Sequence, residues 1–106
     1  MVANIETISN MVKNYADDVR SVMPVHKVFL YGSYAKGNAT EHSDVDVCFF
    51  LSSFENSDWD EIMVKLLSIS RKYRDFIIEP FVFEVSDLYT DNPFVKEVLR
   101  TGIEIH

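Results

Sequence analysis

The chain has 106 residues, of which 47% are hydrophobic, including eight Phe, five Tyr and one Trp. This length and composition predict a single folded domain, residues 1–106, and exclude a disordered chain. The formal net charge of −7 disfavours nucleic acid as a partner, because nonspecific binding needs a basic surface that neutralises phosphates. No apolar stretch approaches the roughly 20 residues that span a bilayer, and no secretory signal pattern opens the chain. We therefore expect a cytoplasmic protein.

The first half of the chain alternates between helical and strand periodicity. Apolar residues recur at spacings of three and four from Ile5 to Val22, which predicts an amphipathic helix ended by Pro24. The elements that follow are a buried strand over 26–31, a loop over 34–43 with room for one helical turn, and a strand over 44–51. The only cysteine, Cys48, lies among Val and Phe in this second strand. We predict a buried, inert thiol and no disulfide.

The second half predicts another helix, a strand and a short closing segment. Ser57 is the predicted cap of the helix. Its apolar face is expected to comprise Trp59, Ile62, Met63, Leu66, Ile69 and Tyr73. A third strand runs from Phe76 to about Glu84, and Pro80 within it predicts an edge strand or a bulge. The last predicted elements are a helix opened by Asn92-Pro93 and stopped at Gly102, and a small strand over 103–106. This order predicts an α/β (α+β) fold, a small mixed sheet with helices packed on it.

A glycine turn follows the first predicted strand. In Leu30-Tyr31-Gly32-Ser33-Tyr34-Ala35-Lys36-Gly37, glycine allows a sharp turn and close approach of a ligand to the backbone. Successive N–H groups after such a turn bind anions, Ser33 adds a hydroxyl donor, and Lys36 adds a positive charge for phosphate oxygens. The motif alone has little specificity, because ordinary tight turns have the same composition.

A pair of carboxylates opens the second predicted strand. Asp44 and Asp46 are two residues apart, so on a strand they project from one face, about 6.5–7 Å apart. Their mutual repulsion would be relieved by a divalent cation, and Mg²⁺ prefers carboxylate oxygens together with substrate phosphates. Two hydrated aspartates at an exposed strand end are the alternative. Together with the glycine turn, however, the pair supplies the parts needed for metal-assisted phosphoryl or nucleotidyl transfer.

The paired motif, Gly32-Ser33 followed by Asp44-Val45-Asp46 on the next strand, resembles the polymerase-β-type nucleotidyltransferase superfamily. Within it the chain is most similar to the minimal nucleotidyltransferases (MNT) of bacteria and archaea, whose length it shares. That resemblance implies the polymerase-β-like fold and an antitoxin paired with a helical toxin of the HEPN class in a hetero-oligomer. It also implies transfer of AMP from ATP to a tyrosine of that partner.

The resemblance further implies roles for individual residues. Gly32 and Ser33 would hold the triphosphate, with Lys36 beside them, and Asp44 and Asp46 would bind two Mg²⁺ ions. A third carboxylate on the following strand would be a metal ligand and general base. Glu79 is the predicted residue, and Glu84 and Asp75 are the alternatives.

The chain departs from the family pattern in two places. Many relatives have Arg where this chain has Lys36, and their third carboxylate is usually Asp rather than the Glu expected here. An antitoxin that is catalytically weak or inactive, and neutralises its partner by binding alone, is therefore the alternative function.

Overall fold

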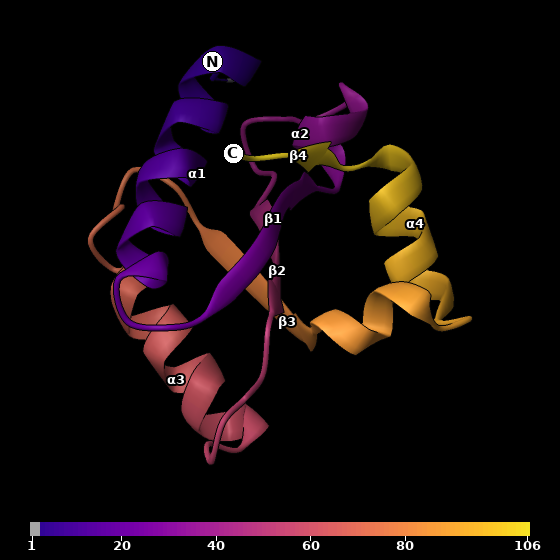
Figure 1. Ribbon diagram of the computed structural model, residues 1–106. Helices are drawn as coiled ribbons and strands as arrows, with labels where there is room; N and C mark the ends of the chain where they lie inside the picture. Colours follow the sequence, from indigo (N-terminus) through magenta and orange to yellow (C-terminus); the bar gives the residue numbers. More distant parts are fainter. Residues whose placement is uncertain (1–2) are drawn as a thin grey trace.

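The computed structural model describes residues 3–106 as a mixed sheet between two layers of helices (Figure 1). The elements are, in chain order, α1 (Ile5–Arg20), β1 (Val25–Tyr31), α2 (Ser33–Lys36), β2 (Val45–Leu51), α3 (Trp59–Ser70), β3 (Ile78–Glu84), the 3₁₀ helix η1 (Val85–Tyr89), α4 (Pro93–Thr101) and β4 (Ile103–Glu104). No helix in this part of the chain is long and apolar enough to span a bilayer.

The sheet has the strand order β3-β2-β1-β4. Strand β1 is antiparallel to both β2 and β4, whereas β2 and β3 are parallel and are connected by α3. The mixed sheet confirms the predicted fold class. Pro80 lies in β3 at one edge of the sheet, as predicted. An edge strand tolerates proline because a missing N–H group there need not remove a hydrogen bond between strands.

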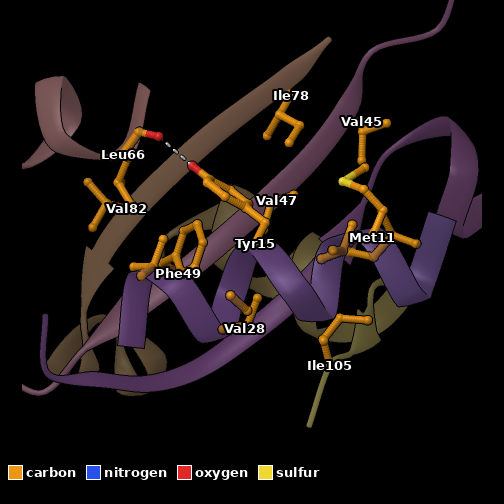
Figure 2. Packing of buried hydrophobic residues seen from close by; sticks show 14 of the residues in the cluster. Met11, Tyr15, Val28, Val45, Val47, Phe49, Leu66, Ile78, Val82 and Ile105 are labelled. Atoms are coloured by element: carbon orange, nitrogen blue, oxygen red, sulfur yellow. Dashed lines mark hydrogen bonds between the residues drawn. The ribbon is translucent and has the colours of Figure 1, made fainter. Parts of the chain in front are cut away.

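Alternating residues of the central strands supply two separate apolar layers. Even-numbered residues of β1 and odd-numbered residues of β2 face α1 and α3, where Tyr15, Phe49 and Leu66 are buried (Figure 2). The Tyr15 hydroxyl donates a hydrogen bond of 2.8 Å to the Leu66 carbonyl, which satisfies the polar end of this ring in the core. The opposite layer contains Phe29, Cys48 and Phe50 from the sheet, and Val95 and Val98 from α4.

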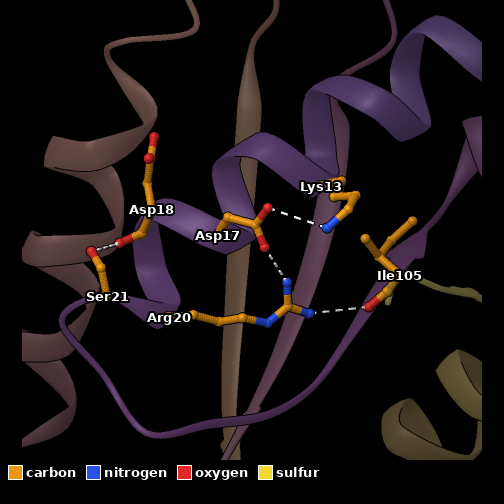
Figure 3. A network of polar contacts seen from close by, with 6 residues as sticks. All are labelled: Lys13, Asp17, Asp18, Arg20, Ser21 and Ile105. Atoms are coloured by element: carbon orange, nitrogen blue, oxygen red, sulfur yellow. Dashed lines mark hydrogen bonds and ion pairs between the residues drawn. The ribbon is translucent and has the colours of Figure 1, made fainter.

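Polar contacts attach α1 to its neighbours and to the end of the chain. Asn4 caps the helix by accepting a hydrogen bond of 2.8 Å from the Thr7 amide. Arg20 donates to Asp17 and also to the Ile105 carbonyl, so α1 holds the segment that follows β4 (Figure 3). Hydrogen bonds from Lys13 and Arg20 lower the pKa of Asp17.

Several predicted details were wrong at the ends of elements. The first helix ends at Arg20, because the chain turns towards Pro24 and leaves Val22 exposed. Asp58 caps α3 in place of Ser57, and accepts a hydrogen bond of 2.8 Å from the Glu61 amide. Trp59, the first residue of α3, is 52% exposed and does not join the apolar face of that helix.

Strand boundaries also moved by one or two residues. β2 begins at Val45, so Asp44 lies just outside it, and β3 begins at Ile78 instead of Phe76. The final strand comprises only Ile103 and Glu104. By contrast, Asn92 caps α4 with Pro93 at its first position, and Gly102 ends it, as the sequence predicts.

Cys48 is a buried free thiol, as predicted. Burial among the aromatic side chains of the α4 layer raises its pKa to about 12. Because the thiolate is the reactive form, this thiol is inert at neutral pH.

Candidate active site

Gly32 makes the turn between β1 and α2 and has backbone angles that only glycine adopts easily. Its φ is 74° and its ψ is −149°. A β-carbon at this position would collide with the carboxylate of Asp46, so the Asp46 side chain lies directly against the Gly32 backbone. The predicted phosphate turn and the predicted carboxylate pair therefore meet in the fold.

α2 is a single helical turn that begins at Ser33. The Lys36 amide donates to the Gly32 carbonyl over 3.0 Å, and Gly37 ends the turn in the left-handed conformation. The first N–H groups of a helix have no partners within it and are available to an anion. Ser33, at the first position, adds its hydroxyl to this group of donors.

The carboxylates of Asp46 and Glu79 project from the sheet face that α4 covers. Asp46 is paired in register with Glu79 on β3 and with Tyr31 on β1, so the three side chains share one face. Asp44 is two residues before Asp46, just ahead of the strand. Asp44 and Asp46 are partly buried, and Glu79 is exposed.

Neither of the two alternative carboxylates lies beside Asp46. Glu84 is opposite Leu51 at the far end of β3, where it forms a capping box with Asp87 at the start of η1. Asp75 precedes β3 and lines a cavity of about 300 Å³ with His42 and Ser43. The register of β2 and β3 thus favours Glu79 as the third carboxylate.

The three carboxylates interact electrostatically. Partial burial, followed by the negative charges of Glu79 and Asp44, raises the pKa of Asp46 to about 6. Asp46 is therefore protonated more readily in the folded chain than in the unfolded chain, where its pKa is near 3.9. The stability that the folded chain gains by holding this proton on Asp46 is fully present below pH 4 and is lost as the pH rises through 6.

Asp46→Asn is accordingly expected to stabilise the fold at pH 8. The substitution removes a charge that repels two neighbours, and we expect a gain of about 1–2 kcal/mol after allowing for solvent screening, or at least about 5 °C in Tm. Thermal unfolding of both proteins at pH 8 and pH 4.5, in chelator, measures the effect, and the difference should shrink at the lower pH. Asp91→Asn, at a fully exposed carboxylate whose ion pair with Lys96 contributes little, should shift Tm by less than about 2 °C. An Asp46→Asn variant that is less stable than the wild type at pH 8 would contradict the proposed repulsion.

Lys36 lies next to the turn but its ammonium group is directed towards α4. It is 3.8 Å from Glu97 Oε1 and 5.5 Å from the centre of the Tyr31 ring. Hydrogen bonds from Arg100, together with the charge of Lys36, lower the pKa of Glu97. Glu97 was not anticipated from the sequence, because no local pattern links a residue of the last helix to the glycine turn.

An aromatic group on the same sheet face was also not anticipated. The Phe94 ring is 5.3 Å from Tyr31 and 5.1 Å from Phe81, centre to centre. Alternation along β3 could have placed Phe81 on the face of Glu79, since the two are two residues apart. The contact with Phe94 arises only from the packing of α4.

The carboxylates do not form a complete metal site by themselves. Among residues 3–106, no three or more Asp, Glu, His or Cys side chains are grouped closely enough to hold a metal ion. Mg²⁺ usually takes one or two carboxylates and completes its shell with water and substrate phosphates. Asp44 and Asp46 fit that chemistry, because a cation here would relieve the repulsion that raises the Asp46 pKa.

Comparison with known proteins identifies related sequences. A family model described as a nucleotidyltransferase domain matches residues 12–101. A protein of Methanocaldococcus jannaschii, provisionally named a protein adenylyltransferase, is 29% identical over 101 residues, which cover 92% of this chain and 98% of that protein.

Solved structures resemble the fold at low sequence identity. A provisionally named nucleotidyltransferase of Sulfolobus solfataricus has a TM-score of 0.64 and 16% identity, covering 94% of this chain and 80% of that one. A toxin–antitoxin structure with AMP-PNP has a TM-score of 0.67 and 14% identity, and the match covers 89% of this chain and 72% of that one. A variant of the toxin–antitoxin MntA-HpeT has a TM-score of 0.66 and 12% identity, and the match covers 92% of this chain and 72% of that one. At these identities the likeness establishes the fold alone. The match to the family model over most of the chain carries the identity: the protein belongs to the nucleotidyltransferase domain family and is a nucleotidyltransferase with the polymerase-β-like fold.

Proposed function

We propose that the chain transfers AMP from ATP to a hydroxyl group of a protein acceptor, a tyrosine of a HEPN-type helical partner, and acts as the antitoxin of that pair. The observation that carries this proposal is the contact between the Asp46 carboxylate and the Gly32 turn, with Glu79 in register beside Asp46. This contact supports a site in which one triphosphate meets both anion donors and carboxylates. The name of the archaeal relative, a protein adenylyltransferase, supports the protein acceptor, and the toxin–antitoxin titles support the pairing.

Each residue has a separate task in the proposed reaction. The N–H groups of α2 and the Ser33 hydroxyl bind the β- and γ-phosphates, and Lys36 joins them only after its ammonium leaves Glu97. Asp44 and Asp46 would hold two Mg²⁺ ions, which would supply charge stabilisation to the triphosphate and lower the pKa of the acceptor hydroxyl.

Glu79 is the proposed general base. Its exposed position beside Asp46 lets it accept the proton of an incoming hydroxyl. The bond from the acceptor oxygen to the α-phosphorus forms as the bond from that phosphorus to the bridging oxygen breaks, and pyrophosphate leaves.

Labelled ATP tests the reaction directly. The purified chain, Mg²⁺ and a HEPN-type helical protein are incubated with ATP labelled at either the α- or the γ-phosphate. Only the α-label is expected to enter the acceptor, and excess chelator should remove at least about 99% of the incorporation, because the carboxylates alone cannot neutralise the triphosphate. Label transferred from the γ-phosphate would indicate a kinase, and incorporation that survives chelator would exclude the metal-assisted mechanism.

Neutralisation by binding alone is the second candidate function. It is favoured by Lys36, whose ion pair with Glu97 directs its ammonium group towards α4. In that case a stable complex forms and the toxin is inhibited without any incorporation of label. Substituting phenylalanine for the modified tyrosine of the partner separates the two, because only transfer requires the hydroxyl.

A further inference from the structure

The loop between α3 and β3 lies beside the candidate active site. Ile77, its last residue, accepts a hydrogen bond of 2.8 Å from the Val45 amide, which extends the pairing of β2 and β3 towards Asp44. Ile77 directly precedes β3 and is two residues before Glu79. The Ile77 side chain is 70% exposed.

This loop also carries positive charge on an acidic chain. Three of the ten basic residues, Arg71, Lys72 and Arg74, occur within four positions. Lys72 has a structural role, because its ammonium is 3.3 Å from Asp18 of α1, to which the Tyr73 hydroxyl also donates. Neither Arg71 nor Arg74 has a side-chain hydrogen bond or ion pair within residues 3–106, and both are exposed. Both guanidinium groups are therefore available to an acidic ligand.

An open hollow of about 410 Å³ lies against these residues. Arg71 and Arg74 line it together with Phe76 and Ile77. Arg74 and Phe76 also line a neighbouring hollow of about 260 Å³, together with Lys72 and one carboxylate, Asp75. The surface therefore combines cations with an apolar floor, the combination that recognises an acidic residue next to an apolar one.

We propose that this hollow binds an acidic segment of the protein acceptor and thereby brings the acceptor hydroxyl to Glu79. The inference rests on the proposed transfer to a protein, and it adds the chemistry of the segment: Asp or Glu residues for Arg71 and Arg74, and an apolar side chain for Phe76 and Ile77. Charge complementarity favours this occupant, because with a net charge of −7 the rest of the molecule repels an acidic segment and leaves the loop as the place where it docks. A nucleic acid is disfavoured, since two free arginines cannot offset the nearby carboxylates along a phosphate backbone.

Peptide binding without ATP tests the docking surface separately from the chemistry. The probes are two fluorescent tyrosine peptides of equal length that both contain leucine, one with flanking Asp and Glu and one with flanking Lys. Fluorescence anisotropy at low salt is expected to give at least about tenfold tighter binding of the acidic peptide, with affinity falling as salt increases.

Charge reversal in the loop provides the decisive comparison. Arg74→Glu is expected to weaken the affinity for the acidic peptide about tenfold, and Arg74→Gln about threefold. Lys65→Glu makes the same charge change at an exposed position of α3 and should alter this affinity less than about twofold. Ile77→Ser should weaken binding about threefold without altering its salt dependence, because it removes only apolar contact. Circular dichroism and Tm verify that each variant is folded.

Three results would overturn the proposal. They are equal affinity for both peptides, an Arg74→Glu variant that binds the acidic peptide like the wild type, and tighter binding of a single-stranded oligonucleotide than of the acidic peptide. A weakened affinity for ATP in Arg74→Glu, with peptide binding unchanged, would likewise assign the arginines to the triphosphate. If the acidic peptide binds through Arg74 but no AMP transfer occurs with any acceptor, the docking surface stands and the proposed function fails.

Discussion

Replacing Asp44 and Asp46 together with asparagine is expected to lower the rate of AMP transfer at least about a thousandfold, because the variant loses the negative charge that holds the divalent cations. Asparagine has nearly the same shape as aspartate, so the contact with the Gly32 turn and the fold should survive. Single-turnover incorporation of α-labelled ATP measures the rate, and calorimetric titration with Mg²⁺ and ATP measures the loss of metal-dependent binding.

The control for this experiment removes two carboxylates that lie away from Asp46. Asp75→Asn combined with Glu84→Gln changes the net charge by the same amount, and we expect transfer to stay within about threefold of the wild type. Glu79→Gln alone should lower the rate of AMP transfer about a hundredfold, which is the usual contribution of a general base. A larger loss from the control pair than from Glu79→Gln would show that the third carboxylate was assigned to the wrong residue.

Gly32→Ala is expected to damage both stability and activity. At φ 74° and ψ −149° an alanine is strained, and its β-carbon would displace the Asp46 carboxylate from its place against the turn. We expect a loss of about 2–3 kcal/mol in the free energy of unfolding and at least about a hundredfold in the rate of transfer. Urea unfolding and the labelled-ATP assay measure the two effects.

Gly37→Ala provides a matched control at the other end of α2. Gly37 also has a positive φ, 81°, but no atom lies within 4 Å of the position that a β-carbon would take. The same substitution here should cost only about 1 kcal/mol of backbone strain and leave the rate of transfer nearly unchanged. If the two variants lose activity equally, the effect at Gly32 comes from α2 as a whole and not from the displaced carboxylate.

Local chemistry explains which parts of the fold could be predicted. Strand alternation and the helical spacing of apolar residues depend on neighbours in the chain, so β1, β2, α1 and α4 lie within a few residues of their predicted positions. Pro80 predicts an edge strand for a local reason as well, since it has no N–H to donate. Trp59 shows the limit of this approach, because helical periodicity does not show which turns of a helix are covered by a neighbouring layer.

By itself, the sequence determined that a glycine turn and an Asp-x-Asp pair end and begin consecutive strands, which is enough to predict a triphosphate and metal site. Only the tertiary structure decided which carboxylate joins that pair, because the register of the parallel strands β2 and β3 puts Glu79 opposite Asp46 and Glu84 opposite Leu51. The packing of α4 likewise directs Lys36 to Glu97, and burial among like charges raises the pKa of Asp46 to about 6. These properties depend on distances between residues far apart in the chain, and such distances are fixed only when the sheet and its helices pack together.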